Sequence, residues 1–166
     1  MGTLLREQAA TSKLAFYQEL CEQLSILLGD EVNFVANTAN AAALLFDALP
    51  NVNWAGFYFA HDETLVLGPF QGKPACVRIP FGKGVCGAAA EQGATIIVPD
   101  VDQFPGHIAC DTASRSEIVV PLVSRGRVVG VLDIDSADLA RFDEDDQEGL
   151  ECVISVLLAS IASYLK

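Results

Sequence analysis

Apolar residues recur at helical spacing in three stretches of the chain, residues 13–28, 34–49 and 143–165. A glycine follows the first stretch and a proline follows the second, and both residues commonly end helices. The third stretch begins with Asp143 and three further acidic residues, which suit the positive N-terminal end of a helix. The pattern therefore predicts a helix in each of the three stretches.

Between the second and third helices the spacing changes to short apolar or alternating runs, which are typical of strands. A Gly- and Ala-rich stretch at residues 82–93 interrupts them and predicts a helix of about two turns. The chain has 166 residues and no internal repeat or linker, which favours one domain. We expect an α+β domain with an antiparallel sheet of about six strands flanked by helices. The expected strands are residues 53–60, 64–68, 75–80, 95–99, 117–123 and 127–135.

The last two strands meet at Ser-Arg-Gly, a tight hairpin sequence in which Gly126 is free to adopt a positive φ. Because strand side chains alternate, Asp133 and Asp135 should point to one face of the sheet and Ile134 to the other. Glu117, at the mouth of the partner strand, can add a third carboxylate at the same end. Neighbouring carboxylates repel each other and do not stabilise a sheet, so the cluster indicates a functional site.

The chain contains five cysteines, an odd number at wide spacing that does not fit a secreted disulfide framework. No C-x-x-C pair occurs and only His61 and His107 could add imidazole ligands, so we expect no structural metal. Cys21 and Cys152 fall within predicted helices, where a cysteine usually packs as a small apolar residue. Three cysteines remain in or near predicted loops: Cys76, Cys86 and Cys110.

Residues Gly82–Gly87 fit the dinucleotide pattern G-x-G-x-x-G. The helix that follows is short and no parallel β-α-β unit surrounds it, so we interpret the stretch as a tight strand-to-helix turn. Cys86 would then lie near a helix N-terminus, where the helix dipole favours a thiolate. Cys110, taken alone, could be an inert loop cysteine.

The strand at residues 53–60 places Trp54 and Tyr58 on one face, and Ala55 and Phe57 on the other. Trp54 fits either a plain core residue or an aromatic wall for a small ligand, since indole combines apolar area with one N–H donor. The pattern leaves both interpretations open.

Composition narrows the possible functions. Hydrophobic residues make up 51% of the chain, which excludes a disordered protein, and the net charge of −12 disfavours nucleic acid and anionic membrane surfaces as partners. No apolar run reaches the roughly 18 residues of a membrane span. The first residues lack the unbroken apolar core of a signal peptide, so we expect a cytoplasmic protein.

Four segments taken together carry a family resemblance: NWAGFYF, LGPFQGKPACVRIPFGKGVCG, GHIACDTASRSEIVVPLV and GVLDIDS. In this order they resemble the free methionine-(R)-sulfoxide reductases, enzymes built on a GAF domain. The resemblance covers residues 34–142. It implies that residues 1–166 form a single GAF domain, with an N-terminal helical segment at 1–30 and a C-terminal helix at 143–165. It also implies a homodimer that reduces the R epimer of free methionine sulfoxide to methionine.

The resemblance further implies a role for each site residue. Cys110 would be the nucleophile, Cys76 the resolving thiol and Cys86 an accessory thiol. Thioredoxin would restore the dithiol as an external reductant, and no bound cofactor or metal would be needed. The carboxylates would serve both catalysis and substrate binding, beside two aromatic residues near the substrate. These residues are Glu117, Asp133, Asp135, Trp54 and Tyr58.

The chemistry of sulfoxide reduction requires a thiol and is assisted by a carboxyl group. A thiolate attacks the sulfoxide sulfur and becomes a sulfenic acid, and a protonated carboxyl group assists by giving a proton to the sulfoxide oxygen. A carboxyl group that is partly buried among other carboxylates has a raised pKa and suits that role. Two other functions remain possible: a non-catalytic GAF module that binds a small ligand, and a thiol peroxidase, which would use Cys110 without requiring the acidic cluster.

Overall fold

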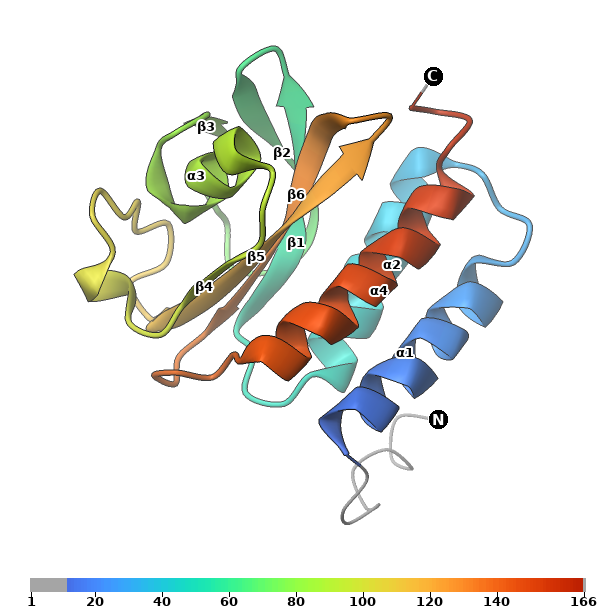
Figure 1. Ribbon diagram of the computed structural model, residues 1–166, viewed down its shortest axis with the longest axis horizontal. Coiled ribbons are helices and arrows are strands. Elements are labelled where there is room, and N and C mark those ends of the chain that lie inside the picture. Colours follow the sequence, from blue (N-terminus) through green and yellow to red (C-terminus); the bar gives the residue numbers. More distant parts are fainter. Residues whose placement is uncertain (1–11, 166) are drawn as a thin grey trace.

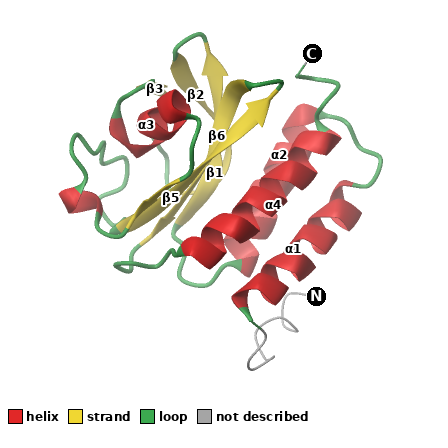
Figure 2. Ribbon diagram, viewed as in Figure 1, coloured by secondary structure: helices red, strands yellow, loops and turns green. Residues whose placement is uncertain are grey.

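The computed structural model describes residues 12–165, and in it a six-stranded antiparallel sheet separates two layers (Figures 1 and 2). The strand order is β3-β2-β1-β6-β5-β4. The α+β architecture expected from the sequence pattern is confirmed. The elements are α1 (Lys13–Leu28), α2 (Phe34–Ala48), β1 (Trp54–His61), β2 (Thr64–Gly72), β3 (Arg78–Pro80), α3 (Gly84–Gln92), β4 (Ile96–Val98), a 3-10 turn (Val101–Gln103), β5 (Ser116–Ser124), β6 (Arg127–Ser136) and α4 (Glu144–Ser160).

Helices α2 and α4 pack on one face of the sheet, and α1 packs against α4 on the side away from the sheet (Figure 1). Their buried side chains form one apolar core with Ala55 and Phe57 of β1 and Ile134 of β6. Helix α4 begins at a capping box, in which the side chains of Asp143 and Asp146 each accept a hydrogen bond from the other residue's backbone N–H. This face is thus a continuous helix-on-sheet core. No helix within residues 12–165 is long and apolar enough to cross a bilayer.

The opposite face carries the short helix α3 and the loops around it (Figure 2). Trp54 and Tyr58 of β1 point to this side and form a second apolar cluster with Val119 of β5 and Cys86 of α3. The two clusters confirm the predicted alternation along β1. The second face is covered mostly by loops, which leaves room for a site.

The predicted hairpin is confirmed, with Arg125 and Gly126 at its tip at φ 52° and 75°. The strand predicted at residues 64–68 is too short, because β2 continues to Gly72. We expected a loop after Gly68 because of the Gly-Pro sequence. Pro69 is tolerated since the pairing with β1 shifts register between Gly56 and Tyr58, and β3 pairs only with residues 64–66 of β2.

Two other predicted boundaries are wrong. β3 begins at Arg78, so Cys76 lies in the connecting loop and not on a strand as expected from residues 75–80. The helix predicted at residues 143–165 ends at Ser160, and turns follow it. The first 11 residues of the predicted N-terminal segment lie outside the described residues.

Candidate active site

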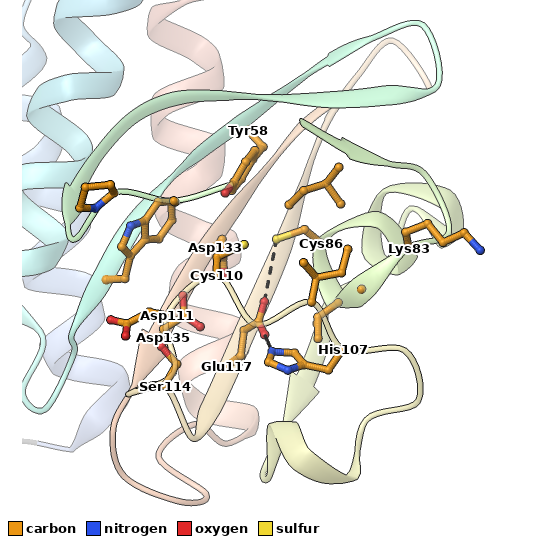
Figure 3. Close-up of a pocket in the computed structure, with 17 residues that line it drawn as sticks. Tyr58, Lys83, Cys86, His107, Cys110, Asp111, Ser114, Glu117, Asp133 and Asp135 are labelled. Carbon is orange, nitrogen blue, oxygen red and sulfur yellow. Dashed lines mark hydrogen bonds and ion pairs between the residues drawn. The ribbon is translucent and has the colours of Figure 1, made fainter. Parts of the chain in front are cut away.

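The pairing of the central strands places the three predicted carboxylates together. Asp135 lies opposite Trp54 of β1 and opposite Glu117 of β5, and Asp133 lies opposite Gly56. All three carboxylates line one pocket on the loop-covered face of the sheet (Figure 3). The prediction from strand alternation is therefore confirmed for these side chains.

Cys76 and Cys110 form a disulfide that closes over this pocket. Their Cα atoms are 5.6 Å apart, although 34 residues separate them along the chain. Cys76 lies in the loop between β2 and β3, and Cys110 lies in the long loop before β5. Two loops that are distant in sequence are thus joined beside the carboxylates.

The aromatic residues of β1 hold the Cys76 loop in place. The Nε1–H of Trp54 donates a hydrogen bond to the carbonyl of Lys73, and the Tyr58 hydroxyl donates to the carbonyl of Cys76, each at 3.0 Å. The Trp54 ring also stacks on Phe70 of β2. Trp54 therefore belongs both to the core and to the pocket wall, and its N–H is already used by the loop backbone.

Cys86 is fully buried at the start of α3, and its thiol lies 3.9 Å from Oε1 of Glu117 (Figure 3). Burial, followed by the nearby charges of Asp133 and Glu117, raises the pKa of Cys86 well above its usual range. Our expectation that the helix dipole would favour a thiolate here is wrong. The dipole of a short helix is outweighed by the loss of solvent and by the surrounding carboxylates.

The carboxylates have raised pKa values for the same reason. Burial is the main cause, and it raises the pKa of Asp133 to about 6 and the pKa values of Glu117 and Asp135 well above their usual range. Charge repulsion from Asp133 adds to the shift at Glu117 and Asp135. Burial therefore favours the protonated form of Glu117 and Asp135, and a protonated carboxyl group can donate a proton.

Asp133 is the carboxyl group of this cluster with an unsatisfied oxygen, because its buried Oδ1 has no hydrogen-bond partner. A buried carboxylate oxygen without a partner is costly unless something else satisfies it. Since Asp133 lines the pocket, a donor on a bound molecule can supply the missing hydrogen bond. The most direct candidate is an ammonium group.

Besides Lys83, sequence reasoning missed three polar residues of the pocket lining, His107, Asp111 and Ser114. Nε2 of His107 lies 3.7 Å from Oε2 of Glu117. Burial lowers the pKa of His107 and raises that of Glu117, so both shifts favour the neutral forms and weaken an ion pair here. All three residues lie within seven positions of Cys110, and this proximity was the information in the sequence that could have identified them.

One group of potential metal ligands lies in the pocket. Single ligand atoms of Cys86, Glu117 and Asp133 lie within 4.8 Å of one another. A thiol and carboxyl groups bind a metal only after losing their protons, and all three groups have raised pKa values. The raised pKa values therefore oppose metal binding at this group of residues.

The cavity beneath the disulfide has a volume of about 40 Å³. This is little more than the space of one water molecule and far below the roughly 300–1,000 Å³ of small-molecule sites. Cys110, Ile108 and His107 of the long loop line it on one side, and Pro74 and Ala75 of the Cys76 loop line it on another. With the disulfide formed, these loops close the pocket.

The pocket combines a disulfide with carboxyl groups whose pKa values are raised, on an α+β scaffold, and this combination is typical of a thiol oxidoreductase. Residues 34–157 match the GAF domain family. The protein YtsP of Bacillus subtilis is 54% identical over 158 residues, covering 94% of this chain and 97% of that protein. The free methionine-R-sulfoxide reductase of Escherichia coli is 49% identical over 152 residues, covering 92% of each chain.

A solved structure supports the same family assignment. The free methionine-R-sulfoxide reductase of Neisseria meningitidis, in complex with its substrate, superimposes with a TM-score of 0.88 at 49% identity, and 93% of each chain is covered. The chain belongs to the GAF-domain family of free methionine-R-sulfoxide reductases and is an oxidoreductase. The expected fold and family are therefore confirmed.

Proposed function

We propose that this protein reduces free L-methionine (R)-sulfoxide to L-methionine through a thiol cycle centred on Cys110. The observation that carries the proposal is the Cys76–Cys110 disulfide beside Glu117, Asp133 and Asp135 in one closed pocket. The E. coli and N. meningitidis relatives, which bear the name of this activity, support the choice of substrate.

In the first step the thiolate of Cys110 attacks the sulfur of the sulfoxide. The sulfoxide oxygen and a proton end on Cys110 as a sulfenic acid, and methionine leaves with its sulfur reduced by two electrons. A proton donated to the oxygen makes the sulfur more electrophilic, and the raised pKa values of Glu117 and Asp135 favour a protonated carboxyl group within the pocket. Either carboxyl group can serve as the donor.

In the second step the thiol of Cys76 condenses with the sulfenic acid and releases water. The product is the Cys76–Cys110 disulfide, which is the state of the described structure. A dithiol reductant, for which we propose thioredoxin, then exchanges with this disulfide and returns both thiols. The net reaction consumes one sulfoxide and one dithiol, and it yields methionine, water and one disulfide. It needs no bound cofactor.

Asp133 and the pocket's charge explain why a free amino acid would be preferred. With a pKa of about 6, Asp133 is mostly ionised near neutral pH, and its unpaired Oδ1 can accept a hydrogen bond from a free ammonium group. A peptide-bound methionine sulfoxide has no ammonium at this position. We therefore assign Asp133 chiefly to substrate binding, and Glu117 and Asp135 chiefly to proton donation. Cys86 remains a candidate accessory thiol.

The volume of the cavity bears on the order in which reduction of the disulfide and substrate binding occur. About 40 Å³ cannot hold an amino acid, so the loops must move before substrate binds, and reduction of the disulfide, which unlinks the loops carrying Cys76 and Cys110, would allow this movement. Formation of the disulfide would then expel the product or follow its release. On this proposal the oxidised enzyme has no measurable affinity for substrate, and isothermal titration calorimetry on both redox forms would test it.

The decisive experiment is a quenched single turnover without external reductant. Cys110→Ser should form no methionine, because a hydroxyl group is far too weakly ionised to attack sulfur. Cys76→Ser should release about one methionine per site and then stall as a sulfenic acid on Cys110, which dimedone labels for mass spectrometry. If Cys76→Ser forms no methionine while Cys110→Ser does, the assigned roles are reversed.

The same assay separates the alternative functions. Reduction of peptide-bound methionine sulfoxide as fast as the free form would contradict the role given to Asp133. Faster thiol-dependent turnover of hydrogen peroxide than of the sulfoxide would indicate a peroxidase, and binding without turnover of either would indicate a sensor. The homodimer and the cytoplasmic location stay predictions, which multi-angle light scattering and cell fractionation would test.

A further inference from the structure

A second pair of cysteines lies on the other face of the sheet, away from the proposed active site. Cys21 belongs to α1 and Cys152 to α4, and their sulfur atoms are 2.7 Å apart although 131 positions separate them in the sequence. Nothing in the proposed catalytic cycle uses either residue. Their contact joins the first described helix of the chain to the last.

The packing of the two helices holds this pair in register. Near the start of both helices, Nζ of Lys13 contacts Asp143 and Asp146, and the Tyr17 hydroxyl donates a hydrogen bond to Asp146. One turn beyond Tyr17, α1 presents Cys21 to α4. Helices anchored in this way hold the two sulfur atoms 2.7 Å apart, and close approach of the two side chains is a condition for a disulfide to form.

The two thiols differ in access to solvent. Cys152 is exposed, whereas Cys21 is buried beneath it at the helix interface. Burial, together with the hydrogen bond and charge of Cys152, raises the pKa of Cys21 to about 12. An external reagent can thus reach Cys152 first, and Cys21 is placed to react only with Cys152.

We propose that Cys21 and Cys152 form a second redox site, which low-molecular-weight disulfides oxidise to an intramolecular disulfide between α1 and α4. In the first exchange the Cys152 thiolate attacks one sulfur of the reagent, forms a mixed disulfide and releases one reduced thiol. Cys21 then loses its proton, attacks the Cys152 sulfur and releases the second reduced thiol. Two protein thiols lose two electrons in all, and one reagent disulfide becomes two thiols.

The second exchange is favoured by proximity. Its attacking atom is already beside its target, so the intramolecular step competes well against further reagent in spite of the high pKa of Cys21. The resulting link would close a loop over most of the chain, and long loops gain the most from cross-linking in the unfolded state. The site would therefore act on stability and leave the chemistry of the pocket unchanged.

The test uses the full chain in buffers with a high ratio of oxidised to reduced glutathione. After acid quenching and alkylation, disulfide mapping by mass spectrometry should find Cys21 linked to Cys152, separately from the Cys76–Cys110 link. The melting temperature of the parent should exceed that of the Cys21→Ser/Cys152→Ser double variant by about 5–15 °C under these conditions. Dithiothreitol should abolish this difference.

Two single variants serve as matched controls. Cys21→Ser should accumulate one glutathione on Cys152, because no partner resolves the mixed disulfide, and Cys152→Ser should remain unmodified at the buried Cys21. The proposal is overturned if the parent also accumulates glutathione on Cys152 without a Cys21–Cys152 link. It is equally overturned if the oxidised product is a Cys152–Cys152 link between two chains. Turnover of the oxidised parent that matches the double variant would support the separation of the two sites.

Discussion

Two buried aspartates, Asp146 and Asp133, lie on opposite faces of the sheet. They differ in whether hydrogen-bond donors and cations compensate the carboxylate. Asp146 is fully buried in the helical layer, where Tyr17 donates to its Oδ1 and Lys13 to its Oδ2, both at 2.8 Å. Arg141 approaches Oδ1 at 3.3 Å. Both oxygens of this carboxylate are therefore compensated within the fold.

Asp133 lies in the loop-covered layer and has carboxyl groups for neighbours instead of cations. Its Oδ1 has no partner, and its pKa is raised by burial. A carboxylate of this kind costs stability, whereas a paired one like Asp146 is needed once it is buried. The difference agrees with a structural role for Asp146 and with the role in substrate binding that we propose for Asp133.

The largest effect is expected on catalysis, in variants of two carboxyl groups of the pocket. Glu117→Gln and Asp135→Asn should each lower kcat/KM for methionine sulfoxide by about 10²- to 10⁴-fold, because a neutral amide cannot donate the proton that the sulfoxide oxygen needs. Neither variant should melt at a lower temperature than the parent, and exposed Asp138→Asn is the control. Activity equal to the parent's in both variants would remove the carboxylates from the mechanism.

The opposite outcome is expected for Asp146. Asp146→Ala should lower the free energy of unfolding by about 3 kcal/mol, because it leaves the Arg141 guanidinium and the Tyr17 hydroxyl without their partner. Urea denaturation measures this loss, and the folded fraction should retain the parent's turnover. A variant that folds as stably as the parent but is inactive would break the assignment of Asp146 to the fold.

The pH dependence of the free energy of unfolding should show how much the burial of the pocket's carboxyl groups destabilises the fold. Since the pKa of Asp133 is about 6 in the folded state, the unfolded chain loses this proton at lower pH than the folded protein does. Stability associated with this group is therefore present below about pH 4 and is lost as the pH rises towards 6. Glu117 and Asp135 act in the same direction.

Replacing Asp133 by a neutral residue should therefore raise the free energy of unfolding most near neutral pH. From pH 4 to pH 7, the stability of Asp133→Asn should improve relative to the parent, with a slope of at most about 1.4 kcal/mol per pH unit. Thermal melts across this range would measure it. Parallel curves for the parent and the variant would show that burial of Asp133 has no such cost.

The smallest effect is expected at the second pair of cysteines. Under reducing conditions Cys21→Ser and Cys152→Ser should each keep turnover within about twofold of the parent, because distant and independent sites do not couple. Steady-state assays with circular dichroism as the folding check would decide this. A loss of turnover in a folded variant would link the helical layer to the pocket.

Much of the site followed from local rules. Alternation along one strand placed Asp133 and Asp135 on the same face, and the hairpin placed Glu117 beside them, because strand geometry depends on few residues. The pairing of Cys76 with Cys110 came from the family resemblance and not from the pattern. It depends on two loops whose paths are set by distant contacts, such as the hydrogen bond from Tyr58 to the Cys76 carbonyl.

The errors share a physical cause. Gly68 and Pro69 predicted a loop, but a register shift in the pairing with β1 accommodates them within a strand. Cys86 does lie at a helix start, yet its burial among carboxylates reverses the expected effect on its pKa. In both cases a tertiary environment overrides a local preference. The contact between Cys21 and Cys152 was also missed, because packing alone was expected of each residue.

The hydrogen bonds that Trp54 and Tyr58 donate to the carbonyl groups of Lys73 and Cys76 have a consequence for how this loop can evolve. Every residue offers the same carbonyl, so an anchor of this kind survives a change of side chain. The exposed Pro74 lies between the two anchored positions and can be replaced while the thiol of Cys76 keeps its place. Rapid sequence drift in this short segment would therefore be compatible with an unchanged catalytic geometry.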